Sequence, residues 1–133
     1  MNPLITIEER RAILDRITET VIGCAHQVSN ILGVGFLEKV YENALVIELH
    51  HAGLDVTQQR RIEVRYREIP VGDFVADIVV QDRVIIEVKA IKTLEEIHYA
   101  QCLNYLRGTN LHECLLVNFG TPRAVIKRVV HNF

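Results

Sequence analysis

The chain has 133 residues, of which 49% are hydrophobic and 24% are charged, and its formal net charge at pH 7 is -2. This balance excludes a disordered chain, and the length favours one domain over residues 1–133 because two independent cores need more residues. The longest run of apolar residues and glycine, Ile31 to Leu37, falls far short of the ~20 residues that a membrane helix needs. Glu8 and Glu9 precede any apolar run, unlike in a secretory signal. We therefore expect a cytoplasmic protein with no membrane partner.

Two helices are predicted before any strand. Thr6 and Glu9 form a capping-box pattern, and apolar residues then recur at spacings of three and four. The first helix is therefore expected over about 7–32. A second helical pattern begins with Leu37 and ends at Gly53.

Strand patterns predominate after residue 54. Apolar residues alternate with charged ones around Val64, and β-branched residues dominate from Phe74 to Val88, which together predict three strands. With the elements that follow, the order is two helices, three strands, a helix and two strands. This order predicts an α/β (α+β) fold with a mixed sheet flanked by helices. The later elements are a helix from a Thr93–Glu96 capping pattern to about Arg107, a strand over 114–119, a turn at 120–122 and a strand over 124–130.

Cysteine and histidine ligands for a metal are not predicted. Cys24, Cys102 and Cys114 show no Cys-x-x-Cys spacing, so neither a disulfide framework nor a four-thiolate zinc site is expected. Three cysteines also cannot hold an iron–sulfur cluster, which needs four. The histidines lack a metal-ligand spacing and are expected at the surface or at helix caps. They are His26, His50, His51, His98, His112 and His131.

Any binding of nucleic acid would have to be local, because the net charge gives no overall attraction to phosphate. Two segments are locally basic, one around Arg60–Arg67 and one around Arg123–Arg128. For both segments a solvated charged surface without function is the alternative.

A hairpin in the middle of the chain is predicted to gather charged side chains on one face. The apolar positions of its two strands share a face only if Val80 pairs with Val84 around a three-residue loop. That register puts Asp77 opposite Glu87, with Lys89 two residues further along the same face. The residues predicted on the opposite, apolar face are Phe74, Ala76, Ile78, Ile86 and Val88.

The two carboxylates allow two interpretations. They can belong to an exposed, salt-bridged surface that contributes only ~0–1 kcal/mol. Against this, Val75, Val79 and Ile85 share the face of Asp77 and Glu87, so the charges would be partly buried. Two carboxylates this close repel each other unless a proton or a cation lies between them, and their oxygens suit Mg²⁺ or Mn²⁺.

The segment Gly35-Phe-Leu-Glu38-Lys-Val-Tyr41 resembles the motif of the GxxExxY proteins, a family placed in the PD-(D/E)XK nuclease superfamily. The resemblance is collinear from Ile17 to Val130. It includes Ala76-Asp77, Ile86-Glu87-Val88-Lys89 and Ala100–Leu106. It implies a restriction-endonuclease-like core with the order α-β-β-β-α-β, which agrees with the order predicted from periodicity.

The resemblance also implies a metal site and catalytic roles. Asp77, Glu87 and the main-chain carbonyl of Val88 would hold Mg²⁺ or Mn²⁺. Glu38 would complete that site or support a second ion. Lys89 would orient the attacking water and stabilise the transition state.

Three further residues are expected to contact the substrate. Gln101 and Tyr105 have a Q-x-x-x-Y spacing similar to that of RecB-like and lambda-exonuclease-like nucleases, in which these residues contact the substrate near the metal. Tyr41 follows Glu38 by three residues, so both point to the same side of a helix and can face one site. The alternatives are core packing for Tyr41 and an unrelated surface position for the other two.

The function implied by the resemblance is metal-dependent hydrolysis of phosphodiester bonds in nucleic acid, with DNA as the expected substrate and an exonuclease-like mode. A catalytically inactive module of the same fold, binding nucleic acid or a protein partner, is the alternative. A slightly acidic domain of this size has little surface for duplex DNA, which favours action as a homodimer or with a partner protein.

Overall fold

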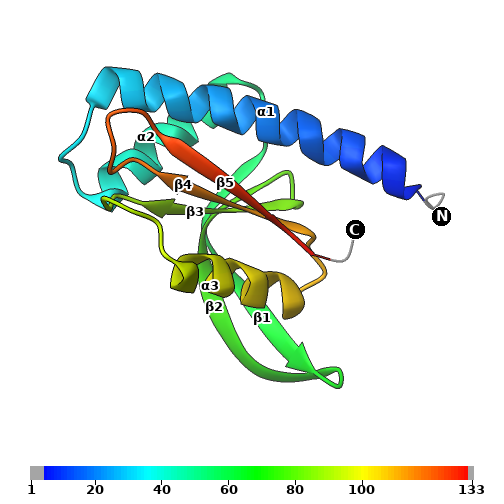
Figure 1. Cartoon of the computed structure of the whole chain (residues 1–133). Helices are drawn as coiled ribbons and strands as arrows, with labels where there is room; N and C mark the ends of the chain where they lie inside the picture. Colours follow the sequence, from blue (N-terminus) through cyan, green and yellow to red (C-terminus); the bar gives the residue numbers. More distant parts are fainter. Residues whose placement is uncertain (1–4, 132–133) are drawn as a thin grey trace.

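The protein, described here by a computed structural model over residues 5–131, is built around a five-stranded sheet with the strand order β1-β2-β3-β4-β5 (Figure 1). Neighbouring strands are antiparallel except β3 and β4, which are parallel, so the sheet is mixed as predicted. Each predicted helix and strand is present. In chain order they are α1 (Ile7–Leu32), α2 (Glu38–His51), β1 (Val56–Tyr66), β2 (Ile69–Val80), β3 (Val84–Lys89), α3 (Glu96–Arg107), β4 (Glu113–Asn118) and β5 (Val125–Val130).

Helices cover both faces of the sheet, with α1 and α2 on one face and α3 on the other (Figure 1). The larger core cluster joins α1 and α2 to residues such as Ile78, Ile86 and Val117. The smaller cluster joins Cys102 and Leu106 of α3 to the opposite face. Strands β3 and β4 are therefore apolar on both sides, as is typical of the central strands of a covered sheet. Among the described residues, no helix has the length and hydrophobicity to cross a membrane.

The starts of two helices test the capping predictions. At α1, Thr6 Oγ1 accepts the N–H of Glu9 at 3.0 Å, and Glu9 Oε2 accepts the N–H of Thr6 at 3.2 Å, which confirms the predicted capping box. At α3 the predicted box of Thr93 with Glu96 is wrong. The cap residue is Glu95, whose N–H donates to Nδ1 of His98 at 2.9 Å.

Strand β2 rotates about its own axis at Asp77. Ala76 packs in the cluster under α3, whereas Ile78 packs in the cluster under α1 and α2. Residues two apart share a face in a regular strand, so the strand must turn between them. The irregularity includes β1, where Gln59 has a φ of 53° and, like Asp77, is skipped in the pairing of the two strands. Phe74 and Ala76 therefore do not share the face of Ile78, and that part of the sequence prediction is wrong.

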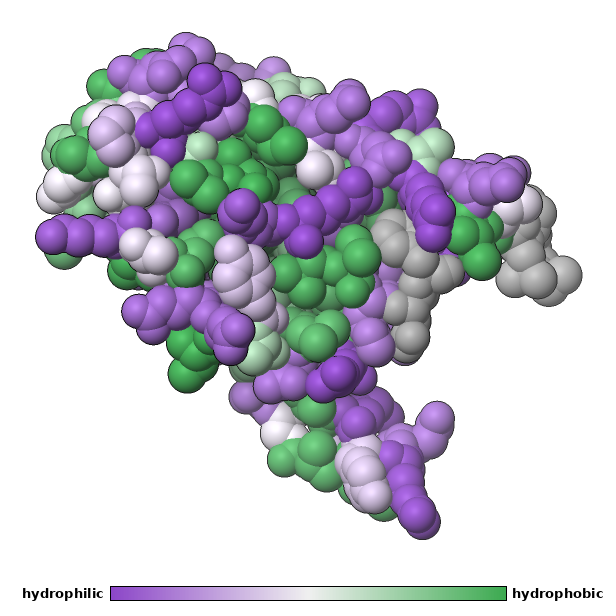
Figure 2. All heavy atoms as spheres, viewed as in Figure 1, coloured by the Kyte–Doolittle hydropathy of each residue, from purple (hydrophilic) through white to green (hydrophobic). Residues whose placement is uncertain are grey.

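Beyond this turn the β1–β2 hairpin projects past α3 as an arm, defined here as residues 60–76 (Figure 1). Figure 2 shows the arm with apolar side chains exposed between hydrophilic ones. The predicted basic segment lies on this arm and is largely neutralised. Its contacts are Arg60 with Asp82, Arg61 with Asp73, Arg65 with Glu63, and Arg67 over the ring of Tyr66.

Candidate active site

The predicted carboxylates meet at the C-terminal end of β3. The hairpin pairs Val80 with Val84 and Ile78 with Ile86, which is the predicted register. One step further, Oδ2 of Asp77 accepts the main-chain N–H of Val88 at 2.8 Å. The N–H and carbonyl of one strand residue point to the same side, so the Val88 carbonyl also faces Asp77. Two carboxylates and one carbonyl therefore converge here.

Glu87 is the most perturbed acid of this group. Its side chain is buried, with the residue only 7% exposed, and its Oε1 has no hydrogen-bond partner. The pKa of Glu87 is raised to about 9, mainly by burial and then by the charge and hydrogen bonding of Asp77, while Lys89 opposes these effects. Without a cation, Glu87 therefore holds a proton at neutral pH. A strongly perturbed, buried acid is typical of a functional site.

The donor set fits a hard divalent cation. Carboxylate and carbonyl oxygens are the ligands that Mg²⁺ and Mn²⁺ prefer. The unpartnered Oε1 of Glu87 gives a cation a place to bind, and a positive charge between Glu87 and Asp77 would remove their repulsion. Within residues 5–131 no three His, Cys, Asp or Glu side chains form a ligand group by themselves. A site here would therefore include the Val88 carbonyl and water.

Glu38 lies at the rim of this group. It is exposed at the first position of α2. Burial raises the pKa of Glu38, Lys89 opposes this, and Asp77 adds to it, so the three side chains are within electrostatic reach of one another. Glu38 is thus placed near the carboxylates but does not form a three-carboxylate group with them.

Tyr41 explains why the predicted Gly-x-x-Glu-x-x-Tyr motif has this spacing. Its hydroxyl donates to the carbonyl of Gly33 at 2.6 Å and accepts the N–H of Phe36 at 3.2 Å. Its ring stacks on Phe119 with 4.8 Å between ring centroids. The loop before α2 has positive φ at Gly33 (68°) and Gly35 (109°). Tyr41 therefore holds this loop, and with it the start of α2 that carries Glu38.

The prediction that Tyr41 contacts the substrate is wrong in this structure. The side chain is 0% exposed, and both hydrogen-bonding capacities of its hydroxyl are used within the protein. The competing interpretation, core packing, is the one the structure supports.

Tyr105 on α3 faces the carboxylates. Its ring stacks on Phe74 with 3.8 Å between ring centroids and an interplanar angle of 5°. Burial raises the pKa of Tyr105 to about 12, with Glu87 as the next largest cause and Asp77 also contributing. The rotation of β2 at Asp77 makes this contact possible, because it brings Phe74 to the α3 side.

Gln101 lies one helical turn before Tyr105 and is exposed. It lines a shallow hollow on α3 together with Ile97, His98 and Asn104. At spacings of three and four, His98, Gln101 and Tyr105 share one flank of the helix. Gln101 thus lies on the same side of α3 as Tyr105 but is more exposed to solvent.

Two residues of this region were not predicted as part of it. His98 caps α3, as expected for a surface or cap histidine, but its charge also lowers the pKa of Glu38, which places it at the rim. The spacing of His98 from Gln101 and Tyr105, three and seven residues, puts it on the same side of the helix and could have predicted this position. Asn118 ends the buried strand β4 and binds the chain that leaves β3. The position of Asn118, a single polar residue directly after the four apolar residues Cys114 to Val117, could have predicted such a role.

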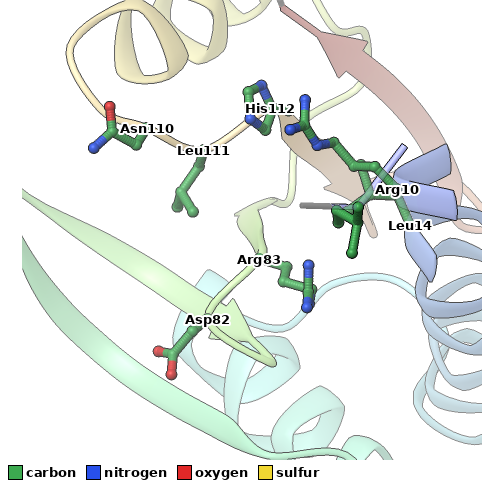
Figure 3. Close-up of a pocket in the computed structure, with 8 residues that line it drawn as sticks. Arg10, Leu14, Asp82, Arg83, Asn110, Leu111 and His112 are labelled. Carbon is green, nitrogen blue, oxygen red and sulfur yellow. The ribbon is translucent and has the colours of Figure 1, made fainter. Parts of the chain in front are cut away.

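A separate pocket lies at the other end of β3. Figure 3 shows it between Arg10 and Leu14 of α1, the turn residue Arg83, and His112 before β4. Its volume is about 230 Å³. Arg83 immediately precedes β3, whereas Glu87 and Lys89 lie near its C-terminal end. The pocket is therefore distinct from the carboxylate group.

The comparisons with known proteins bear on this arrangement. A model of the PD-(D/E)XK nuclease superfamily matches residues 15–129. None of the curated proteins compared with the chain has a matching sequence. Three chains of solved structures match.

The first of these structures is described as the crystal structure of SSO0001, with a TM-score of 0.55 and 14% identity over 72% of this chain and 51% of that chain. This chain thus spans about half the length of SSO0001. An alkaline exonuclease, LHK-Exo, from Laribacter hongkongensis aligns with a TM-score of 0.48 and 12% identity over 81% of this chain and 76% of that chain. Its complex with dAMP gives a TM-score of 0.40 and 12% identity over 86% and 83%.

SSO0001 supports the fold alone, since its sequence identity is low. The family model covers most of the chain. The match includes β1 to β4, all but the last residue of β5, and every residue of the carboxylate group. The chain belongs to the PD-(D/E)XK nuclease superfamily.

Proposed function

We propose that the protein is a metal-dependent nuclease of the GxxExxY type that hydrolyses phosphodiester bonds in DNA. The observation that carries this proposal is the convergence of Asp77, buried Glu87 and the Val88 carbonyl at the end of β3. A buried carboxyl group with an unpartnered oxygen lowers the stability of the fold, so a role in function is the better explanation for Glu87 beside Asp77.

The proposed roles follow from the positions of the side chains. Asp77, Glu87 and the Val88 carbonyl would hold Mg²⁺ or Mn²⁺, with Glu38 at the rim binding through water or supporting a second ion. When bound, the metal supplies a more acidic water and neutralises charge on the phosphate. Lys89, within electrostatic reach of Glu87, would orient the attacking water and stabilise the developing negative charge.

The substrate backbone would lie along the flank of α3. Tyr105 is fixed by Phe74 and faces Glu87, so its hydroxyl is suited to a hydrogen bond with a phosphate near the cleaved bond. Gln101, one turn away and exposed, would contact the next part of the backbone. The Q-x-x-x-Y spacing of these residues supports an exonuclease-like mode. Three free cysteines support a cytoplasmic location.

The test is a panel of end-labelled single-stranded and duplex DNA and RNA, incubated with Mg²⁺, Mn²⁺ or a chelator. We expect cleavage of DNA with either metal, none with the chelator, and mononucleotide products from one end. Lys89→Ala, measured beside the parent, excludes a contaminating nuclease. The absence of both cleavage and divalent-metal binding in the parent would contradict the proposal.

A catalytically inactive module that binds nucleic acid or a protein partner is the second candidate. The arm favours it, because Ile69, Val71 and Val75 are all more than half exposed there. Exposed apolar groups on a projecting hairpin are suited to contact with a second copy or another protein. Metal binding without cleavage, together with complex formation through the arm, would support this candidate.

A further inference from the structure

Asn118 binds the chain that leaves the proposed active site. It is the last residue of β4 and is 2% exposed. Its Oδ1 accepts the N–H of Ile91 at 3.0 Å, and its Nδ2 donates to the carbonyl of Ile91 at 2.8 Å. Oδ1 also accepts the N–H of Gly120 at 3.0 Å. One side chain therefore satisfies three main-chain groups in two separate loops.

These bonds extend the β3–β4 pairing past its last residues. Lys89 pairs with Asn118 in the parallel ladder, and the Phe119 N–H donates to the Lys89 carbonyl at 2.8 Å. Ile91 comes only two residues after Lys89. The main chain is thus fixed at Lys89 itself and again two residues later, which restricts where the Lys89 side chain can point.

Gly120 shows how tightly the two loops are joined. A Cβ atom at this position would lie 1.9 Å from the Ile91 carbonyl oxygen and 2.4 Å from the Ile91 nitrogen. Only glycine allows this approach, because the neighbouring Ile91 atoms belong to the main chain and cannot move independently. Asn118 and Gly120 therefore fix the same segment by independent means, one by hydrogen bonds and one by the absence of a side chain.

We infer that Asn118 is a positioning residue that orients Lys89 for phosphodiester hydrolysis by holding Ile91 against the end of β4. This inference rests on the proposed nuclease function. The Asn118 side chain bonds to the main chain of Ile91 and Gly120, so it acts through the segment that follows β3. Oriented groups matter because a displacement of about 1 Å in a catalytic side chain can lower the rate ~10²-fold.

Two variants loosen the segment in different ways. Asn118→Asp keeps the size and the acceptor oxygens but loses the donor to Ile91, and Gly120→Ala introduces the clash with Ile91. Asn110→Asp makes the same chemical change at the other end of the sheet. Gly72→Ala makes the glycine change where a Cβ would meet nothing within 4 Å. Both controls should behave as the parent.

For the two loosened variants we expect kcat to fall about 10- to 100-fold with KM and Mn²⁺ affinity within about twofold of the parent. A double-mutant cycle separates positioning from general destabilisation. In a Lys89→Ala background, Asn118→Asp should cause little further loss, because the residue it positions is gone. Equal losses in both backgrounds, or a parent-like kcat for Asn118→Asp, would overturn the inference.

A measurement without catalysis keeps the inference separate from the proposed function. The rate at which an amine-acylating reagent labels Lys89, measured by peptide mass spectrometry, should change several-fold in Asn118→Asp, while Lys127 on β5 keeps its parental rate. If the parent does not cleave nucleic acid but this change is found, the nuclease proposal fails and the positioning of Lys89 stands. Unchanged labelling of Lys89 would overturn the inference whether or not the parent cleaves.

Discussion

The Asp77 carboxylate accepts the main-chain N–H of Val88 at 2.8 Å, across the β2–β3 hairpin. A side chain thus takes the place of a main-chain acceptor at the point where β2 rotates. The bond fixes Asp77 beside the Val88 carbonyl and Glu87. A carboxylate that accepts one N–H still has lone pairs for a cation. The local geometry of the hairpin therefore brings these oxygens together before any metal binds.

Asp77→Asn tests the charge of this arrangement separately from its geometry. The amide oxygen can still accept the Val88 N–H, so the hairpin should be retained. One negative charge is lost, so we expect Mn²⁺ affinity in calorimetry to fall at least about tenfold. In chelator the pKa of Glu87 should be lower in the variant than in the parent, because the charge of Asp77 is one of the causes that raise it. Asp73→Asn, on the arm, is the control; parental Mn²⁺ affinity in Asp77→Asn would show that Asp77 is not a ligand.

Glu87 should make the stability of the metal-free protein depend on pH. Its folded pKa, about 9, is above the ordinary 4.5, so between these values the folded state holds a proton that the unfolded state has lost. The contribution of Glu87 to the free energy of unfolding should therefore be fully present below pH 4.5 and fall by up to about 1.4 kcal/mol per pH unit towards pH 9. Urea unfolding in chelator from pH 5 to 9 measures this slope.

Glu87→Gln should flatten that slope, because its amide does not titrate. Glu19→Gln, at an exposed position of α1, should keep the parental slope. If the parent and Glu87→Gln lose stability equally with pH, the proton is not held by Glu87.

The fold and the position of the carboxylates could be predicted because each depends on a repeating local signal. The apolar stripe of α1 and the matched apolar parity of β2 and β3 leave one register, with Val80 opposite Val84. That register alone places Asp77 near Glu87. Each of these features follows from neighbours in the chain or from one hairpin.

The parts that could not be predicted depend on a break in periodicity or on burial by distant elements. Alternation assigns Ala76 and Ile78 to one face, but the strand turns between them, where Asp77 and the irregular Gln59 of β1 are skipped in the pairing. The burial of Tyr41 depends on Phe119, far along the chain. The spacing of Glu38 and Tyr41 shows that they share a helix side, but it does not show which of them reaches solvent.

Substitutions of Lys89 and of Glu87 should impair cleavage in different ways. Lys89→Ala leaves the proposed ligands intact, so we expect parental Mn²⁺ affinity and a kcat about 10²- to 10³-fold lower, as when one transition-state contact is removed. Glu87→Gln should lose metal affinity and cleavage together. Lys92→Ala, in the exposed loop after β3, is the matched control. Fast cleavage by Lys89→Ala would contradict the role assigned to the lysine.

Tyr41→Phe should show that the motif tyrosine organises the loop before α2. The stack on Phe119 is retained, but Gly33 and Phe36 lose a buried partner, which costs about 1–3 kcal/mol of unfolding free energy. We expect lower thermal stability and faster amide exchange in the loop, with Mn²⁺ affinity unchanged. Tyr66→Phe on the exposed arm should have no effect. Parental amide exchange at Phe36 would contradict this role.

Tyr105→Phe tests whether the tyrosine of α3 contacts the substrate or only packs. The phenyl ring can keep the stack on Phe74, so the stability of the variant should match that of the parent within about 0.5 kcal/mol. If the hydroxyl donates to a phosphate, its loss removes one hydrogen bond to a charged group, and KM for DNA should rise about tenfold. Tyr105→Ala removes the stack as well and should be less stable by a further ~0.5–1.5 kcal/mol or more.

Gln101→Ala completes the test of Tyr105, because an exposed glutamine contributes little to folding and any rise in KM then reports substrate contact. Glu96→Gln, at the exposed first position of the same helix and on the side away from Tyr105, controls for changes in α3 itself. Raised KM in Tyr105→Phe and Gln101→Ala, with unchanged unfolding temperatures, would place the nucleic acid along this flank of α3. A parental KM in both variants would show that the substrate approaches Glu87 from another side, and the exonuclease-like mode would then lose its support.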